Sequence, residues 1–142
     1  MISAVLLDTG PLVAFLNRRD RYHVWATAEM AGLRPPLLTC EAVLSETCFL
    51  LRKLDSGTDA VFCLLERGLI TVRFRLDEEV QAVRKLMARY GRIPMSLADA
   101  CLVRMAEQNS DSVLLTLDAA FRVYRKHARH VIPTLMPEVR SR

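Results

Sequence analysis

The chain has 142 residues, a length typical of one domain, and 51% of them are hydrophobic while 25% are charged. This balance excludes a disordered chain, and no apolar stretch approaches membrane-spanning length, so we expect a cytoplasmic protein. The net charge of +4 comes from 20 mostly arginine cations against 16 acids and favours a polyanionic partner. We expect one domain over residues 1–136 and a short tail over 137–142.

The cysteines are widely spaced and form no C-x-x-C pair, although four cysteines could form two disulfides. Without a secretory signal, they are expected to be reduced thiols in apolar surroundings. They are Cys40, Cys48, Cys63 and Cys101.

The first expected strand ends on an acid that is a candidate site residue. Within residues 3–11 an apolar run ends on Asp8, and after Thr9 and Gly10, Pro11 suits the first position of a helix that we expect to reach Leu16. Asp8 therefore lies at the carboxyl end of a buried strand, the edge at which open α/β sheets bind ligands. The alternative is that Asp8 only shapes the turn.

The next elements are a helix over 22–31 with Asp20 as its cap, a strand over 37–39 and a helix over 40–54 capped by Thr39. On a helical wheel Glu41 lies on the polar face, whereas Glu46 lies on the flank of the apolar stripe and is expected to point inward. A buried carboxylate needs a partner, which is either a metal ion or Lys53.

A helix over 58–67 ends at Gly68, and a β-branched strand follows over 69–74. The acids at 77–79 are expected in the first turn of a helix that reaches residue 90. A further helix over 96–109 begins with Ser96 and Asp99, a near match to a capping box. Asp99 also lies on the core side of this helix, so it either only caps the helix or also serves a site.

Residues 113–116 form a fourth strand that delivers Asp118 to the start of a helix at 119, which repeats the pattern around Asp8. A fifth strand over 131–135 contains Pro133, which favours a sheet edge. Strands that alternate with helices predict an α/β fold with a mainly parallel sheet, and this arrangement gathers the strand ends at one edge.

Four carboxylates at one edge would repel each other unless their pKa values rise or a cation joins them. Oxygen ligands without cysteine or histidine favour Mg²⁺ or Mn²⁺, and such ions activate water for phosphodiester displacement. The three histidines lack metal or catalytic spacing, and phosphate-loop and nucleophile-elbow motifs are absent. The four acids are Asp8, Glu46, Asp99 and Asp118.

Four motifs in order carry a family resemblance: Leu7-Asp8-Thr9-Gly10, Thr39-x-x-x-Val43-x-x-Glu46, Leu97-Ala98-Asp99-Ala100 and Leu115-Thr116-Leu117-Asp118-x-x-Phe121. The chain resembles PIN-domain ribonucleases, and its length resembles their VapC-type toxins. The resemblance implies a three-layer α/β/α sandwich, homodimerisation and inhibition by a cognate antitoxin. It also implies that the four acids hold Mg²⁺ or Mn²⁺, with Thr9 and Thr116 as supporting hydroxyls. Many relatives have a further acid where this chain has Ala119 and Ala120, which leaves the second metal open.

The resulting hypothesis is a metal-dependent endoribonuclease acting on single-stranded or looped RNA, the toxin of a toxin–antitoxin pair. Candidate phosphate contacts are Arg18, Arg19, Arg21 and Arg92. Candidate dimer contacts are Met30, Phe49, Phe62 and Leu65. One alternative is a non-catalytic RNA- or protein-binding module. The other is a phosphohydrolase with Asp8 as nucleophile, although Gly10 stands where haloacid-dehalogenase-like enzymes have a second aspartate.

Overall fold

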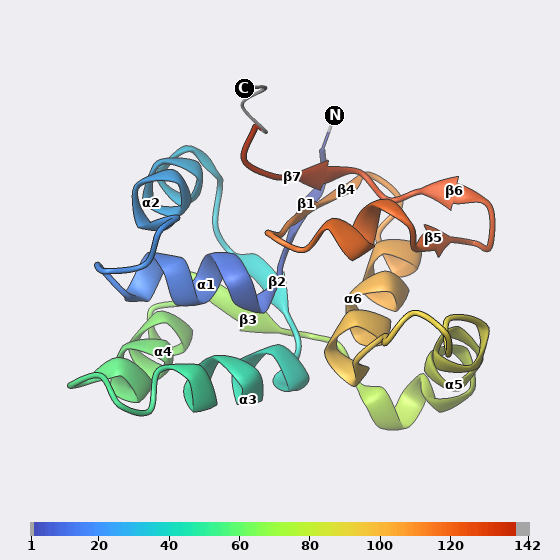
Figure 1. The fold of residues 1–142 in the computed structure, drawn as a ribbon, viewed down its shortest axis with the longest axis horizontal. Helices are drawn as coiled ribbons and strands as arrows, with labels where there is room; N and C mark the ends of the chain where they lie inside the picture. Colours follow the sequence, from blue (N-terminus) through green and yellow to red (C-terminus); the bar gives the residue numbers. More distant parts are fainter. Residues whose placement is uncertain (1, 139–142) are drawn as a thin grey trace.

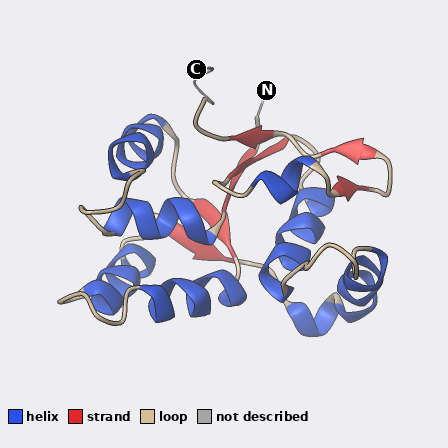
Figure 2. Ribbon diagram, in the orientation of Figure 1, coloured by secondary structure: helices blue, strands red, loops and turns tan. Residues whose placement is uncertain are grey.

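A five-stranded parallel sheet runs through the centre of the computed structural model, which describes residues 2–138 (Figures 1 and 2). The strand order is β3-β2-β1-β4-β7. The strands are β1 (Ala4–Leu7), β2 (Leu37–Thr39), β3 (Ile70–Val72), β4 (Ser112–Leu115) and β7 (Thr134–Leu135). The predicted mainly parallel α/β sheet is therefore confirmed.

Helices cover both faces of this sheet and make the three predicted layers. One side carries α1 (Thr9–Leu16), α2 (His23–Gly32) and α4 (Gly57–Glu66), and the other carries α5 (Val80–Arg89) and α6 (Leu97–Gln108) (Figure 1). Helix α3 (Glu41–Leu50) follows β2 and packs against α1, α4 and α6.

The alternation of side chains along the strands divides the core in two. Leu6 pairs in register with Leu38 and Leu114, and these three residues pack under α5 and α6. Their neighbours Leu7 and Leu115 point to the opposite face and pack under the other helices. Both faces of a parallel sheet are buried, which explains why the strands read as continuous apolar runs.

Helix α1 begins at Thr9, two residues earlier than the expected start at Pro11. Asp8 caps it, and its side chain accepts a hydrogen bond from the backbone N–H of Thr9. Pro11 fits because the first-turn N–H groups of a helix have no intrahelical acceptor.

Two expected caps are wrong. The side chain of Asp20 accepts the Tyr22 N–H in a turn before α2, which begins at His23. The Thr39 hydroxyl donates to the Leu7 carbonyl at 2.9 Å instead of capping α3, and so it ties β2 to β1. Helix α3 also ends at Leu50 rather than at residue 54.

The acids at 77–79 do not form the first turn of an α-helix. Asp77 and Glu78 lie in a separate 3-10 turn, η1 (Leu76–Glu78), where both pair with Arg75. Glu79 precedes α5 and pairs with Arg104 of α6 at 2.8 Å. This last ion pair fastens the start of α5 to α6.

The segment after β4 differs most from expectation. A 3-10 turn, η2 (Ala119–Arg122), replaces the expected helix, and a hairpin of β5 (Arg125–Lys126) and β6 (His130–Val131) follows. The expected fifth strand is thus divided between β6 and β7. Strand β7 is the sheet edge, as Pro133 predicted.

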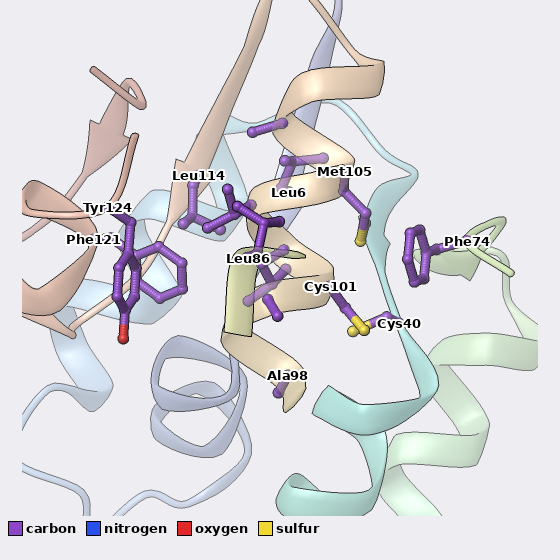
Figure 3. Packing of buried hydrophobic residues seen from close by; sticks show 14 of the residues in the cluster. Leu6, Cys40, Phe74, Leu86, Ala98, Cys101, Met105, Leu114, Phe121 and Tyr124 are labelled. Carbon is purple, nitrogen blue, oxygen red and sulfur yellow. The ribbon is translucent and has the colours of Figure 1, made fainter. Parts of the chain in front are cut away.

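Cys40 and Cys101 are buried in the larger core, where Figure 3 shows their sulfur atoms side by side. All four cysteines are free thiols, as expected, although Cys48 and Cys63 are only half-buried. Among residues 2–138 no helix combines the length and the apolar character needed to cross a membrane. Of the expected tail, residues 139–142 lie outside the described part of the chain.

Candidate functional site

Asp8 lies at the carboxyl end of the central strand β1 and is 6% exposed. Its Oδ1 accepts the Thr9 N–H at 2.7 Å, and its Oδ2 accepts the Thr116 hydroxyl at 2.7 Å. One donor comes from the helix that Asp8 caps and the other from the end of the neighbouring strand. The two bonds fix the orientation of the carboxylate between β1 and β4.

The environment of Asp8 disfavours its charge. Burial is the largest cause and raises the pKa of Asp8 from 3.8 to about 6. Its two hydrogen bonds lower the pKa, while the charges of Asp99 and Asp118 raise it further. These three acids therefore lie close enough to repel each other, although they come from distant parts of the sequence.

Asp99 occupies the first turn of α6 and completes a capping box with Ser96. The Asp99 N–H donates to Ser96 Oγ at 3.0 Å, and the Ser96 N–H donates to Asp99 Oδ2 at 3.4 Å. The Tyr124 hydroxyl also donates to Oδ2 at 3.1 Å. Burial raises the pKa of Asp99, its hydrogen bonds lower it, and the charge of Asp118 adds to the increase. Asp99 thus has the expected capping role and also belongs to the acidic group.

Asp118 is exposed, and its Oδ1 accepts the Ala120 N–H at 2.9 Å as the cap of η2. Its own N–H donates at 3.0 Å to the hydroxyl of Thr116, the same hydroxyl that donates to Asp8. Thr116 is fully buried. One hydroxyl therefore couples the positions of two acids.

The expected inward orientation of Glu46 is wrong. Glu46 does not point into the core, because its side chain is exposed on α3. Its Oε2 nevertheless accepts the Thr9 hydroxyl at 2.9 Å, which links Glu46 to the residue next to Asp8. Lys53 forms no ion pair with Glu46 among the described side chains, and Glu41 is exposed as expected.

The chemistry of this donor set fits a hard divalent cation. The ligands are carboxylate oxygens, and none of the ion pairs found within residues 2–138 involves any of the four acids. Two of the aspartates also lie at helix N-termini, which favour negative charge. In the described part of the chain, however, no group of three or more potential ligands is already arranged around one point.

The four arginines expected to contact phosphate are all exposed. Arg18, Arg19 and Arg21 follow the C-terminal end of α1, whereas Asp8 caps its N-terminal end. Arg92 lies before α6 and near Asp99 in sequence. The structure therefore separates the first three from the acids by the length of α1.

Sequence reasoning missed Tyr124, which has no exposed surface and contacts an acid that lies 25 residues earlier. It lies between η2 and β5, where no helical or strand periodicity predicts the direction of a side chain. The only available signal was its position three residues after Phe121, the last residue of the fourth motif.

A hollow of about 940 Å³ lies elsewhere, between α5, α6 and the hairpin. Its lining includes Glu79, Arg104, Glu107 and His127 but none of the four acids. Arg104 pairs there with both Glu79 and Glu107. This hollow is therefore not part of the site formed by the four acids.

A family match covers the part of the chain that carries the four acids. The family model of the PIN domain matches residues 5–127, which include all four acids. The chain belongs to the PIN-domain family. No curated protein sequence matches this PIN domain.

The fold of the PIN domain is also found in a solved structure. The crystal structure of VapC20 from Mycobacterium tuberculosis, described as a toxin that cleaves the sarcin–ricin loop, superposes with a TM-score of 0.69. The match covers 78% of this chain and 87% of that chain at 22% sequence identity. At this identity the similarity establishes the shared fold.

Proposed function

We propose that this PIN-domain protein is a divalent-metal-dependent endoribonuclease, with Asp8, Glu46, Asp99 and Asp118 as its catalytic acids. The observation that carries the proposal is the buried carboxylate of Asp8, whose charge is opposed by Asp99 and Asp118 and balanced by no described cationic side chain. A bound Mg²⁺ or Mn²⁺ would remove this repulsion.

The four acids would divide into two pairs with different roles in the mechanism. When bound, the metal ion supplies Lewis-acid stabilisation of the phosphodiester and lowers the pKa of a water molecule. Asp8 and Asp99 would hold the ion, because hydrogen bonds fix the orientation of both carboxylates. The exposed carboxylates of Glu46 and Asp118 complete the site or orient the attacking water. The hydroxyls of Thr9 and Thr116 hold Glu46 and Asp8, respectively, in position by hydrogen bonds.

We infer further that the protein is the toxin of a toxin–antitoxin pair, that it forms a homodimer and that a cognate antitoxin inhibits it. The fold shared with a toxin that cleaves the sarcin–ricin loop supports this proposal and favours a looped RNA substrate. Phe49 and Phe62 are 61% and 54% exposed, which supports a protein-covered surface on α3 and α4. Met30 and Leu65 are half-buried and belong to the smaller core, so they contribute less to such a surface.

The test is cleavage of structured and unstructured RNAs by the purified protein, freed of any antitoxin, with Mn²⁺ or with EDTA. We expect cleavage with Mn²⁺ only, and a loss of at least about a hundred-fold in Asp99→Asn. Glu46→Gln and Glu41→Gln provide a matched pair, because both residues are exposed on α3 but only Glu46 contacts Thr9. Glu46→Gln should lose activity and Glu41→Gln should retain it.

Equal cleavage by the wild type and Asp99→Asn would contradict the proposal. A correctly folded protein that cleaves none of the RNAs would instead favour a non-catalytic binding module. A phosphohydrolase that uses Asp8 as nucleophile is disfavoured, because Gly10 stands where such enzymes have a second aspartate; trapping an aspartyl-phosphate on Asp8 would support this alternative instead. Arg18, Arg19, Arg21 and Arg92 are proposed phosphate contacts, tested by the salt dependence of RNA binding.

A further inference from the structure

We propose that Tyr124 is a positioning residue of this site, whose hydroxyl holds the Asp99 carboxylate in the orientation that binds the divalent cation. The inference rests on the proposed metal-dependent function and extends it to a residue outside the four motifs. The contact that carries it is the 3.1 Å hydrogen bond from the Tyr124 hydroxyl to Asp99 Oδ2.

The ring of Tyr124 is held rigidly, so its hydroxyl is a fixed donor. It is fully buried and packs edge-on against Phe121 at 5.3 Å and against Tyr90 at 5.1 Å between ring centroids. Figure 3 shows the Tyr124 ring beside Phe121, with its hydroxyl oxygen extending beyond the rings. Edge-to-face aromatic packing is favourable at these separations.

Tyr124 acts on one oxygen of Asp99. Both the Tyr124 hydroxyl and the Ser96 N–H donate to Oδ2. Oδ1 accepts no hydrogen bond from any residue in the described range 2–138. The two donors therefore fix the carboxylate while leaving Oδ1 available to a cation, the arrangement by which outer hydrogen bonds orient metal ligands.

The position of Tyr124 also connects the acids to each other. It lies two residues beyond η2, the turn that Asp118 caps, and it reaches the first turn of α6. The hydroxyl thus fastens the segment that carries Asp118 to the helix that carries Asp99. A contact needed only for core packing would require the ring and not the hydroxyl.

The neighbouring Tyr90 provides a matched control. Its ring packs against Tyr124, but its hydroxyl accepts the Arg125 N–H at 2.9 Å and contacts none of the four acids. Tyr124→Phe and Tyr90→Phe each delete one hydroxyl from the same aromatic cluster. They differ in whether the deleted group contacts Asp99.

The experiment measures the binding of Mn²⁺ alone by isothermal titration calorimetry, together with the kcat and KM for RNA cleavage. For Tyr124→Phe we expect a loss of about ten-fold to a hundred-fold in Mn²⁺ affinity and a lower kcat, with an unchanged KM for RNA. Excess Mn²⁺ should restore much of the lost activity. Tyr90→Phe should remain within about two-fold of the wild type in Mn²⁺ affinity.

Two further measurements separate positioning from folding. Thermal unfolding in EDTA checks that both variants fold, and adding Tyr124→Phe to Asp99→Asn should cause no further loss of Mn²⁺ affinity. If the wild type binds Mn²⁺ and cleaves RNA while Tyr124→Phe matches Tyr90→Phe in Mn²⁺ affinity, the role of Tyr124 is refuted and the proposed function stands. A wild type that binds no Mn²⁺ would refute both.

Discussion

Replacing Asp8 with asparagine should change the stability of the metal-free protein in a pH-dependent way, in favour of the variant as the pH rises. The pKa of Asp8 rises from 3.8 to about 6, mainly by burial, so the folded state holds a proton on this residue more tightly than the unfolded state does. A carboxyl group of this kind costs stability once it ionises. At about 1.4 kcal/mol per pKa unit, the cost at neutral pH is about 3 kcal/mol.

The sign of the pH dependence follows from this difference. Below the unfolded-state pKa of 3.8 Asp8 is protonated in both states and contributes no penalty. As the pH rises through about 6, the penalty grows to its full value. The asparagine of the variant does not titrate, and its amide nitrogen cannot accept one of the two hydrogen bonds that Asp8 accepts, which costs about 1–3 kcal/mol at every pH. From about pH 4 to about pH 7.5, the difference in unfolding free energy should therefore shift by about 2–3 kcal/mol in favour of Asp8→Asn.

Urea unfolding of the wild type and Asp8→Asn in EDTA, from about pH 4 to about pH 7.5, measures this difference. Asp77→Asn is the control, because Asp77 is exposed and Arg75 lowers its pKa, so its substitution should give no stability at neutral pH. Mn²⁺ should then stabilise the wild type and leave Asp8→Asn unchanged. A stability difference that does not change with pH, or that shifts in favour of the wild type as the pH rises, would contradict this explanation.

Two further substitutions test contacts around the same strand ends. Thr116→Val should cost about 1–3 kcal/mol in the free energy of unfolding, because it leaves Asp8 Oδ2 without its hydroxyl donor; Thr116→Ser should retain most of that stability. Gly10→Ala would bring a Cβ to 3.2 Å from Leu117 and should cost about 1–3 kcal/mol, measured by thermal unfolding. Gly32→Ala, which has no neighbour within 4 Å, should be close to neutral, and equal losses in the two glycine variants would contradict this packing argument.

The sequence was most informative at the strand ends. An apolar run that stops on an acid or on a hydroxyl is recognisable without a structure, and it located Asp8 and Thr116 at the carboxyl edge of the sheet. The pattern works because a parallel strand is buried on both faces, so its first polar residue marks the point where the chain leaves the core. Ser96 and Asp99 were predicted for a similar reason, since a capping box is a local interaction.

The orientation of Glu46 was wrong because the helical wheel assumed a longer helix. The apolar stripe was centred partly on Leu50 and Leu54, but α3 ends at Leu50, and these two side chains are 56% and 36% exposed. The face that is actually buried passes through Val43 and Thr47, which leaves Glu46 outside the core. Helix ends set by tertiary contacts are not visible in periodicity alone.

The contact between Tyr124 and Asp99 could not be predicted from the sequence either. This contact joins a short 3-10 turn to the start of a distant helix, so no spacing in the sequence indicates it. The same holds for the link from Thr9 to Glu46, which spans 37 residues. These contacts depend on how the elements pack, and the sequence predicts the elements better than their packing.

Diffraction from crystals soaked in Mn²⁺, recorded with the anomalous signal of manganese, tests the central claim most directly. We predict a manganese peak that contacts carboxylate oxygens of both Asp8 and Asp99 at about 2.0–2.2 Å, and the loss of that peak in Asp99→Asn. Manganese found only at exposed acids elsewhere, such as Asp77 and Glu78, would contradict the existence of a metal site at this edge of the sheet.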